Sequence, residues 1–173
     1  MSINEKKIVD FKVVTKANDS SAFSSGLYSW LMFLINLYSR VKKNLKIDFD
    51  SFIILQLVVS NYLYKTNKEG IKDYKETGEL FNSDKNLFKE NRKVNIVSVA
   101  EILNLPRETV RRKVMYLSKL KLLDYNKKGV GLGSEYKNVF NEFVYETTNN
   151  ISSLIKKWNS DGSLNQLLNM KKK

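Results

Sequence analysis

The stretch from Ile96 to Leu117 constrains the fold most, because its helical pattern of apolar residues is interrupted at Asn104-Leu105-Pro106. Asn adopts a left-handed backbone conformation more readily than most residues other than glycine. Pro106 has no backbone N–H and cannot continue a helix, but its fixed φ suits the start of a new one. The sequence therefore predicts two helices that meet at a tight turn centred on Asn104.

The boundaries of these two helices follow from capping residues. We expect the first to begin at Ser98, a suitable N-cap residue, and Glu101 three positions later completes a capping box. The second is expected to run from about Arg107 to Leu122.

The second helix has two different faces. At 100° per residue, Val110, Val114 and Leu117 share one face, which we expect to lie toward the first helix and the core. The other side carries Glu108, Arg111, Arg112, Met115 and Lys119. Cationic side chains near a helix N-terminus oppose the helix dipole, and a bound phosphate would satisfy both.

Three positions match a helix-turn-helix unit, in which a small residue lies where the helices touch, an Asn or Gly makes the turn, and a β-branched residue packs back. They are Ala100, Asn104 and Val110. Residues 122–133 then read as a strand, a basic tip, a glycine-rich turn and a short return strand, which indicates a β-hairpin. The predicted fold class is mainly α: a winged helix-turn-helix with a short β-hairpin wing, flanked by N- and C-terminal helices.

Apolar residues at steps of three and four predict those flanking helices, at about 25–45 and 136–158. The first stripe consists of Leu27, Leu31, Leu34, Tyr38, Val41 and Leu45. The second consists of Phe140, Val144, Thr147, Ile151, Leu154 and Trp158. A further helix, apolar nearly all round, is expected from Asp48 or Asp50 to about Tyr64.

The chain therefore divides into four parts. We expect an N-terminal helical region (1–65), in which 8–14 form a short strand or helix, and an exposed polar connection (66–93) with one short helix around 80–88. The winged helix-turn-helix (94–136) follows, and a C-terminal helix with a basic tail (137–173) ends the chain.

The charge balance favours a polyanionic partner, since 30 basic residues face 18 acidic ones and the net charge is +12. Lysine is weak evidence in a chain rich in Lys, Asn and Ile. Arginine is more informative, because three of its five occurrences fall within six residues, at Arg107, Arg111 and Arg112. Its forked donors suit phosphate and guanine.

The run Arg107-Glu108-Thr109-Val110-x-Arg112 is similar to the R-E-T-V-x-R run of the cyclic-AMP receptor protein family. The resemblance covers only about residues 96–125. It implies that Arg107, Glu108 and Arg112 read base edges and that Thr109 contacts phosphate. Lys113 departs from the family, which usually has an apolar residue there. Nothing resembles the family's nucleotide-binding β-roll, and the helical layout looks more like that of MarR-type regulators.

These observations predict a sequence-specific double-stranded DNA-binding protein, a homodimeric transcriptional regulator joined through its terminal helices. The expected DNA-binding residues are Arg107, Glu108, Thr109, Arg111, Arg112, Tyr116, Lys127 and Lys128. A plasmid or phage replication or partition protein, and a winged-helix protein-interaction module, are the alternatives. Whether a small molecule is sensed stays open.

Other functions are disfavoured by residue types that the sequence lacks. It contains no histidine and no cysteine, which removes Ser-His-Asp and Cys-His catalysis and almost every zinc site. We therefore expect no enzyme activity, metal or cofactor. The apolar runs at 27–38 and 52–59 are shorter than the ~20 residues that span a bilayer, and no secretory signal is visible, so a cytoplasmic protein without a membrane partner is expected.

Overall fold

The computed structural model describes residues 22–83 and 93–170, which are mainly helical with one two-stranded antiparallel sheet. This confirms the predicted mainly α class and the β-hairpin. The N-terminal helices are α1 (Ala22–Arg40), which continues as the π-helical segment η1 (Val41–Leu45), α2 (Phe49–Asn67) and α3 (Tyr74–Asn82). Then come α5 (Ile96–Leu103), α6 (Arg107–Lys119), β1 (Leu123–Asn126) and β2 (Gly129–Leu132). The chain ends in α7 (Tyr136–Asn138), the π-helical segment η3 (Val139–Val144), α8 (Tyr145–Ser160) and α9 (Ser163–Leu168).

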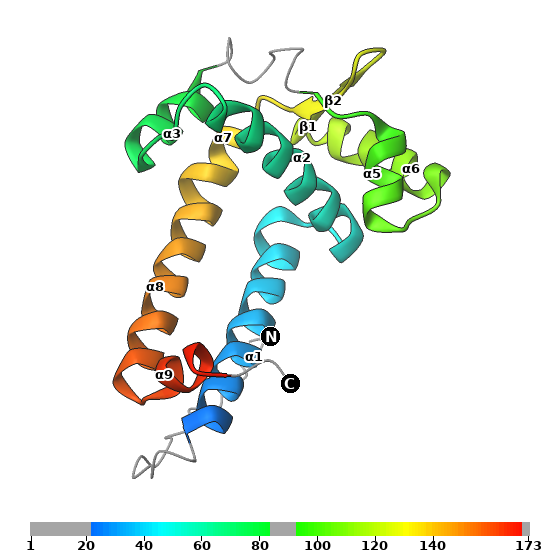
Figure 1. The fold of residues 1–173 in the computed structure, drawn as a ribbon. Coiled ribbons are helices and arrows are strands. Elements are labelled where there is room, and N and C mark those ends of the chain that lie inside the picture. The colour runs from blue at the N-terminus through cyan, green and yellow to red at the C-terminus, as the bar shows by residue number, and fades with distance from the viewer. Residues whose placement is uncertain (1–21, 84–92, 171–173) are drawn as a thin grey trace, which may run out of the picture.

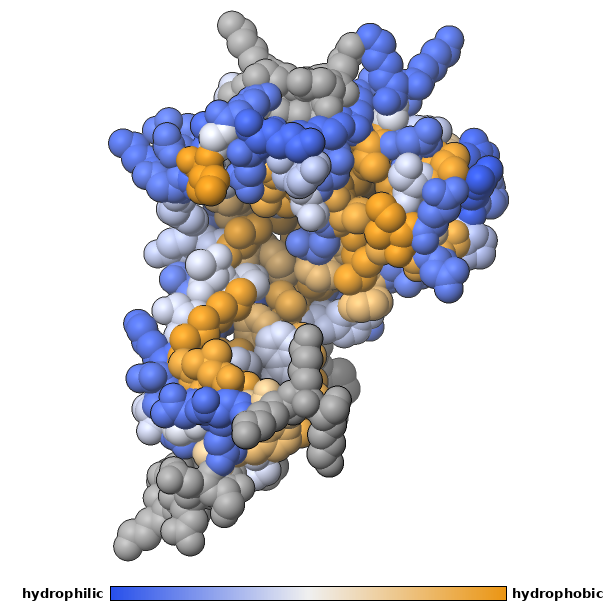
Figure 2. Space-filling model, viewed as in Figure 1, coloured by the Kyte–Doolittle hydropathy of each residue, from blue (hydrophilic) through white to orange (hydrophobic). Residues whose placement is uncertain are grey.

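The elements form two regions (Figure 1). The long helices α1 and α8 lie side by side in the lower part of the molecule, and α9 packs against both at one end. The α5–α6 unit and the hairpin lie at the upper right, and α2 lies between them and the long helices. Hydrophilic side chains cover the hairpin tip and the outer edge of the α5–α6 unit (Figure 2).

The core forms around α2, which contacts α5, α6 and β2. Because α2 is buried on most sides, its sequence is apolar nearly all round. Asp48 caps α2 by accepting a hydrogen bond from the Ser51 backbone N–H at 2.9 Å, so the first of the two predicted caps is confirmed. The fully buried side chains include Ile54, Leu55, Val58, Val110, Val114, Leu117, Val130, Leu132 and Tyr136.

Part of the predicted polar connection belongs to this core. The expected short helix around residues 80–88 lies earlier, at α3, and residues 84–88 are outside the described part of the chain. Phe81 is 1% exposed, and its ring centroid lies 4.8 Å from that of Phe140 and 5.1 Å from that of Tyr136. A single buried aromatic residue in a charged stretch produces no periodic pattern, and the expectation of an exposed connection is wrong at this position.

Helix α1 packs on α8 and α9 through small residues. Gly26 lies against Ser163 so closely that a Cβ at position 26 would lie 2.7 Å from the Ser163 Cβ. Trp158 Nε1 donates a hydrogen bond of 3.1 Å to the Gly26 carbonyl oxygen. At the other end of α1, the Arg40 guanidinium lies 2.9 Å from the Glu146 carboxylate.

The predicted stripe on α1 lies on a different face from these contacts. Leu27, Leu31, Leu34 and Tyr38 are 37% to 49% exposed, and only the end of the stripe, from Val41, enters the core. These four side chains are therefore only partly covered by other described residues, and the Tyr38 ring lies 5.4 Å from that of Phe49 between centroids.

The predicted C-terminal helix is observed as the run from α7 through η3 to α8, which ends two residues later than expected. The tail forms α9. The expectations for residues 8–14 and for the three lysines of the predicted basic tail lie outside the described residues. Within the described ranges, no helix is both long and apolar enough to cross a bilayer.

Candidate nucleic-acid interface

The first helix of the predicted pair, α5, begins earlier than expected. Asn95 caps it, with its side-chain oxygen accepting a hydrogen bond of 2.9 Å from the Val97 N–H, so the predicted capping box of Ser98 and Glu101 is wrong. The reason is non-local, because Val94 exchanges two backbone hydrogen bonds of 2.9 Å with Val130 and is held extended. The chain consequently enters the helix at the next residue.

The turn between α5 and α6 has the predicted geometry. Asn104 adopts a left-handed conformation, with φ 50° and ψ 44°. Pro106 directly precedes α6, and its carbonyl oxygen accepts a hydrogen bond of 3.0 Å from the Val110 N–H. Ala100 and Val110 are both buried, as expected for the positions where the two helices touch. The inward face of Val110, Val114 and Leu117 is confirmed.

The outer side of α6 carries the predicted charged residues, but they differ in their pairing. Arg111 Nε donates to Glu108 Oε2 at 3.1 Å, and this hydrogen bond raises the pKa of the Arg111 guanidinium. Arg107 Nη2 lies 3.9 Å from a Glu101 carboxylate oxygen. Arg112 is exposed and has no ion-pair partner among the residues that the structure describes. The predicted Thr109 is half-buried at the start of the helix.

Two further residues of α6 that the sequence singled out, Lys113 and Tyr116, face the N-terminal end of α2. Lys113, the residue that departs from the resembling family, forms an ion pair with Asp48 and lies 3.8 Å from Asp50. Its side chain is only 16% exposed. The Tyr116 hydroxyl donates to the Lys46 carbonyl oxygen at 3.3 Å. Lys113 thus makes a polar contact between α6 and the start of α2.

The hairpin presents its two lysines at the tip, where Lys127 and Lys128 form a two-residue turn between paired Asn126 and Gly129. The predicted glycine-rich turn is therefore wrong, since Gly129 and Gly131 belong to the return strand. A Cβ at Gly129, which has φ +125°, would lie 2.6 Å from the Val94 carbonyl oxygen. Gly129 therefore allows the Val94 carbonyl oxygen to approach β2 closely. The tip residues Lys127 and Lys128 are exposed.

The sequence did not predict that Lys93, at the base of the hairpin, is buried. The Lys93 side chain is 3% exposed, and its Nζ lies 2.5 Å from Asp124 Oδ2 in β1. Lys65 Nζ, at the end of α2, donates to the Lys93 carbonyl oxygen at 3.0 Å. No sequence signal distinguishes Lys93 among 30 basic residues.

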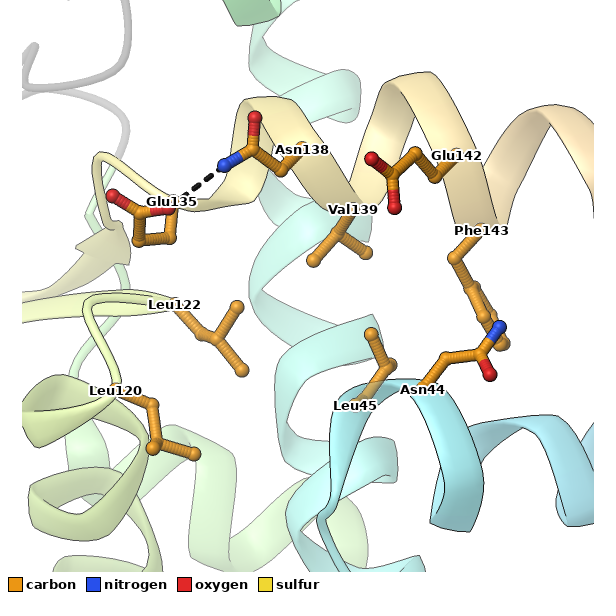
Figure 3. A pocket seen from close by; sticks show the side chains of 9 residues that line it. All are labelled: Asn44, Leu45, Leu120, Leu122, Glu135, Asn138, Val139, Glu142 and Phe143. Atoms are coloured by element: carbon orange, nitrogen blue, oxygen red, sulfur yellow. Dashed lines mark hydrogen bonds between the residues drawn. The ribbon is translucent and has the colours of Figure 1, made fainter.

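A pocket of about 270 Å³ lies beyond the end of α6 (Figure 3). Leu45, Leu122 and Val139 point toward one another in it, and Glu135 accepts a hydrogen bond of 2.8 Å from Asn138 Nδ2. Its walls include both π-helical segments, η1 and η3, whose turns are wider than those of an α-helix. The helical turns of η1, which follows α1, and of η3, which leads into α8, are thus wider where these segments pass the end of α6.

The described residues contain no group of acidic side chains that could hold a metal ion. Comparison of the chain with known protein families, curated proteins and solved structures found no match.

Proposed function

We propose that residues 94–136 are a winged helix-turn-helix and that the protein binds double-stranded DNA sequence-specifically in the cytoplasm. The observation that carries this proposal is the orientation of α6. The left-handed turn at Asn104 and the buried face at Val110 hold this helix so that Arg107, Arg111 and Arg112 lie in solvent. A helix so exposed fits the major groove, and the hairpin tip beside it supplies two further cations.

The pairing of the arginines suggests different roles for them. Arg112 has no ion-pair partner to release within residues 22–83 and 93–170, so it is the residue best placed to donate two hydrogen bonds to guanine. Arg111 lies about 100° around the helix and would contact the phosphate backbone. Its pair with Glu108 is exposed, and exposed ion pairs are weak because water screens them, so DNA is able to displace it. Glu108 would then be available to accept a hydrogen bond from cytosine. Arg107 would read a neighbouring base edge, and Thr109 would contact a phosphate.

We further propose that the protein is a homodimeric transcriptional regulator. Its copies would meet through α1 and not through both terminal helices, because Phe140 and Leu154 of the predicted C-terminal stripe are buried within the chain. Phe23, Trp30 and Ile35 share the exposed face of Leu27–Tyr38 at 100° per residue. Together these side chains expose roughly 600 Å² of mainly apolar surface, a large part of the ~800 Å² that each partner buries in a stable interface. A two-fold dimer would place two copies of α6 in successive major grooves, about 34 Å apart.

Selection of bound duplexes from a random pool tests the proposal directly. A regulator of this kind should enrich two half-sites related by two-fold symmetry and separated by one helical turn. Retention of duplexes without sequence enrichment would contradict specificity and favour an architectural role. A chain that retains no duplex even at low salt would contradict DNA binding and favour a protein partner for the same surface.

A further inference from the structure

Helix α2 is connected to both parts of the proposed DNA-binding surface, by an ion pair at its start and by a hydrogen bond at its end. Asp48, the N-cap residue of α2, pairs with Lys113 of α6. At its last turn, Lys65 donates to the Lys93 carbonyl oxygen, and Lys93 pairs with Asp124 of the hairpin. At 1.5 Å per residue, the two links lie about 25 Å apart along α2.

The link to the hairpin depends on an uncommon group, since lysine is almost never fully buried unless it is paired. The aliphatic part of Lys93 lies against Gly131, where a Cβ would be 3.1 Å from the Lys93 Cγ. The neighbouring Val94 is hydrogen-bonded to Val130 in both directions. Asp124 of β1 and Val130 of β2 are therefore both held by residues 93 and 94, which precede α5.

The link to α6 fixes the rotation of that helix about its axis. Asp48 accepts hydrogen bonds from the Ser51 N–H and from Lys113 Nζ, so a residue that caps α2 also holds α6. Lys113 and Tyr116 lie three residues apart on α6, and both reach the junction between η1 and α2. A rotation of α6 would break both contacts and would also turn the neighbouring Arg112.

From these contacts we infer that two ion pairs position the DNA-binding elements separately. Lys93–Asp124 positions the hairpin tip with Lys127 and Lys128, and Asp48–Lys113 positions the base-reading face of α6. The four paired residues act through other residues and need not touch DNA. This inference depends on the proposed DNA binding. Its test measures the salt dependence of affinity and the ratio of affinities for two duplexes, and a loss of stability alone would not change one of these without the other.

The test compares two single variants of the full-length protein on the selected duplex and on a scrambled one. Lys93→Met removes the buried cation and keeps a side chain of similar length. It should lower the slope of log affinity against log salt by about 1 to 2, the share of the two tip lysines, and leave the ratio of the two affinities unchanged. Lys113→Met should lower that ratio by about tenfold or more and leave the slope unchanged.

Lys156→Met provides the matched control, because Lys156 is exposed on α8, far along the chain from both links. It should change neither quantity. Where Lys93→Met does not fold, as judged by circular dichroism, Asp124→Asn tests the same link with a smaller change, because it keeps the shape of the side chain. This variant should lower the slope in the same way.

The outcomes separate this inference from the proposed function. If the wild-type protein retains no duplex, the proposed function fails. If the wild-type protein binds and folded Lys93→Met and Asp124→Asn keep its salt slope, the role of the hairpin link is overturned. A parallel loss of slope and ratio in both Lys93→Met and Lys113→Met would overturn the separate positioning.

Discussion

The Arg111 guanidinium lies 3.1 Å from the Glu108 carboxylate, one turn earlier on α6, while the adjacent Arg112 has no ion-pair partner among the described residues. Two neighbouring arginines on one helix therefore start from different states. Arg111 must give up an exposed ion pair to bind DNA, and Arg112 is available without rearrangement. The pairing leads to separate predictions for the two residues.

Arg112→Ala should weaken binding to the selected duplex by about 1 to 3 kcal/mol and leave affinity for a scrambled duplex nearly intact. The reason is that a bidentate contact to guanine exists only on the correct site. Arg111→Ala is the matched comparison and should weaken both duplexes about equally, because a phosphate contact carries no sequence information. Titrations of both variants on both duplexes at one salt concentration measure this. Equal losses on the two duplexes for Arg112→Ala would refute base reading by this residue.

The hairpin tip should contribute to the electrostatic part of binding alone. Replacing Lys127 and Lys128 together by alanine should lower the slope of log affinity against log salt by about 0.9 for each phosphate that a lysine no longer neutralises. Specificity between the selected and scrambled duplexes should persist, since α6 is unchanged. Affinities measured over a series of salt concentrations give the slope, and an unchanged slope would remove the hairpin from the DNA.

The local parts of the candidate site were predictable from the sequence. Asn104 and Pro106 determine the backbone of the turn by their own conformational preferences. Val110, Val114 and Leu117 identify the inward face of α6 because helical periodicity alone relates them.

The parts that depend on distant residues were not predictable in this way. The cap at Asn95 follows from the pairing of Val94 with Val130, and Lys93 meets Asp124 across 31 positions of the chain. Phe81 enters the core alone from a charged segment, without a pattern. Neither the propensities nor the local spacing of residues reports such contacts.

The exposed stripe on α1 predicts a dimer that a single charge disrupts. Leu31→Glu places a carboxylate in the middle of the apolar face, where burial without a partner costs several kcal/mol. The wild-type protein should sediment as a dimer at micromolar concentration and the variant as the 20.1 kDa monomer. Asn36→Glu, on another side of the same helix, is the control and should remain dimeric. A monomeric wild-type protein would contradict the α1 interface.

The ion pair between Asp48 and Lys113 predicts a specific dependence of stability on pH. Partial burial raises the pKa of Asp48, but hydrogen bonds from Lys113 and from Ser51 outweigh it and lower the pKa from 3.8 to about 2. Because the folded-state pKa lies below the unfolded one, the charge stabilises the protein fully above pH 5 and loses this effect as the pH falls toward 2.

Asp48→Asn keeps a good N-cap and removes only the charge. The difference in unfolding free energy between wild type and variant should be about 1 kcal/mol at pH 6, after allowance for the exposure of the pair, and should fall to a small fraction of this at pH 2, where the folded-state carboxyl group is half protonated. Urea unfolding of both proteins from pH 6 to pH 2 measures it. The Lys113→Met background should flatten the dependence, and a difference that stays constant over this range would show that the pair does not stabilise the fold.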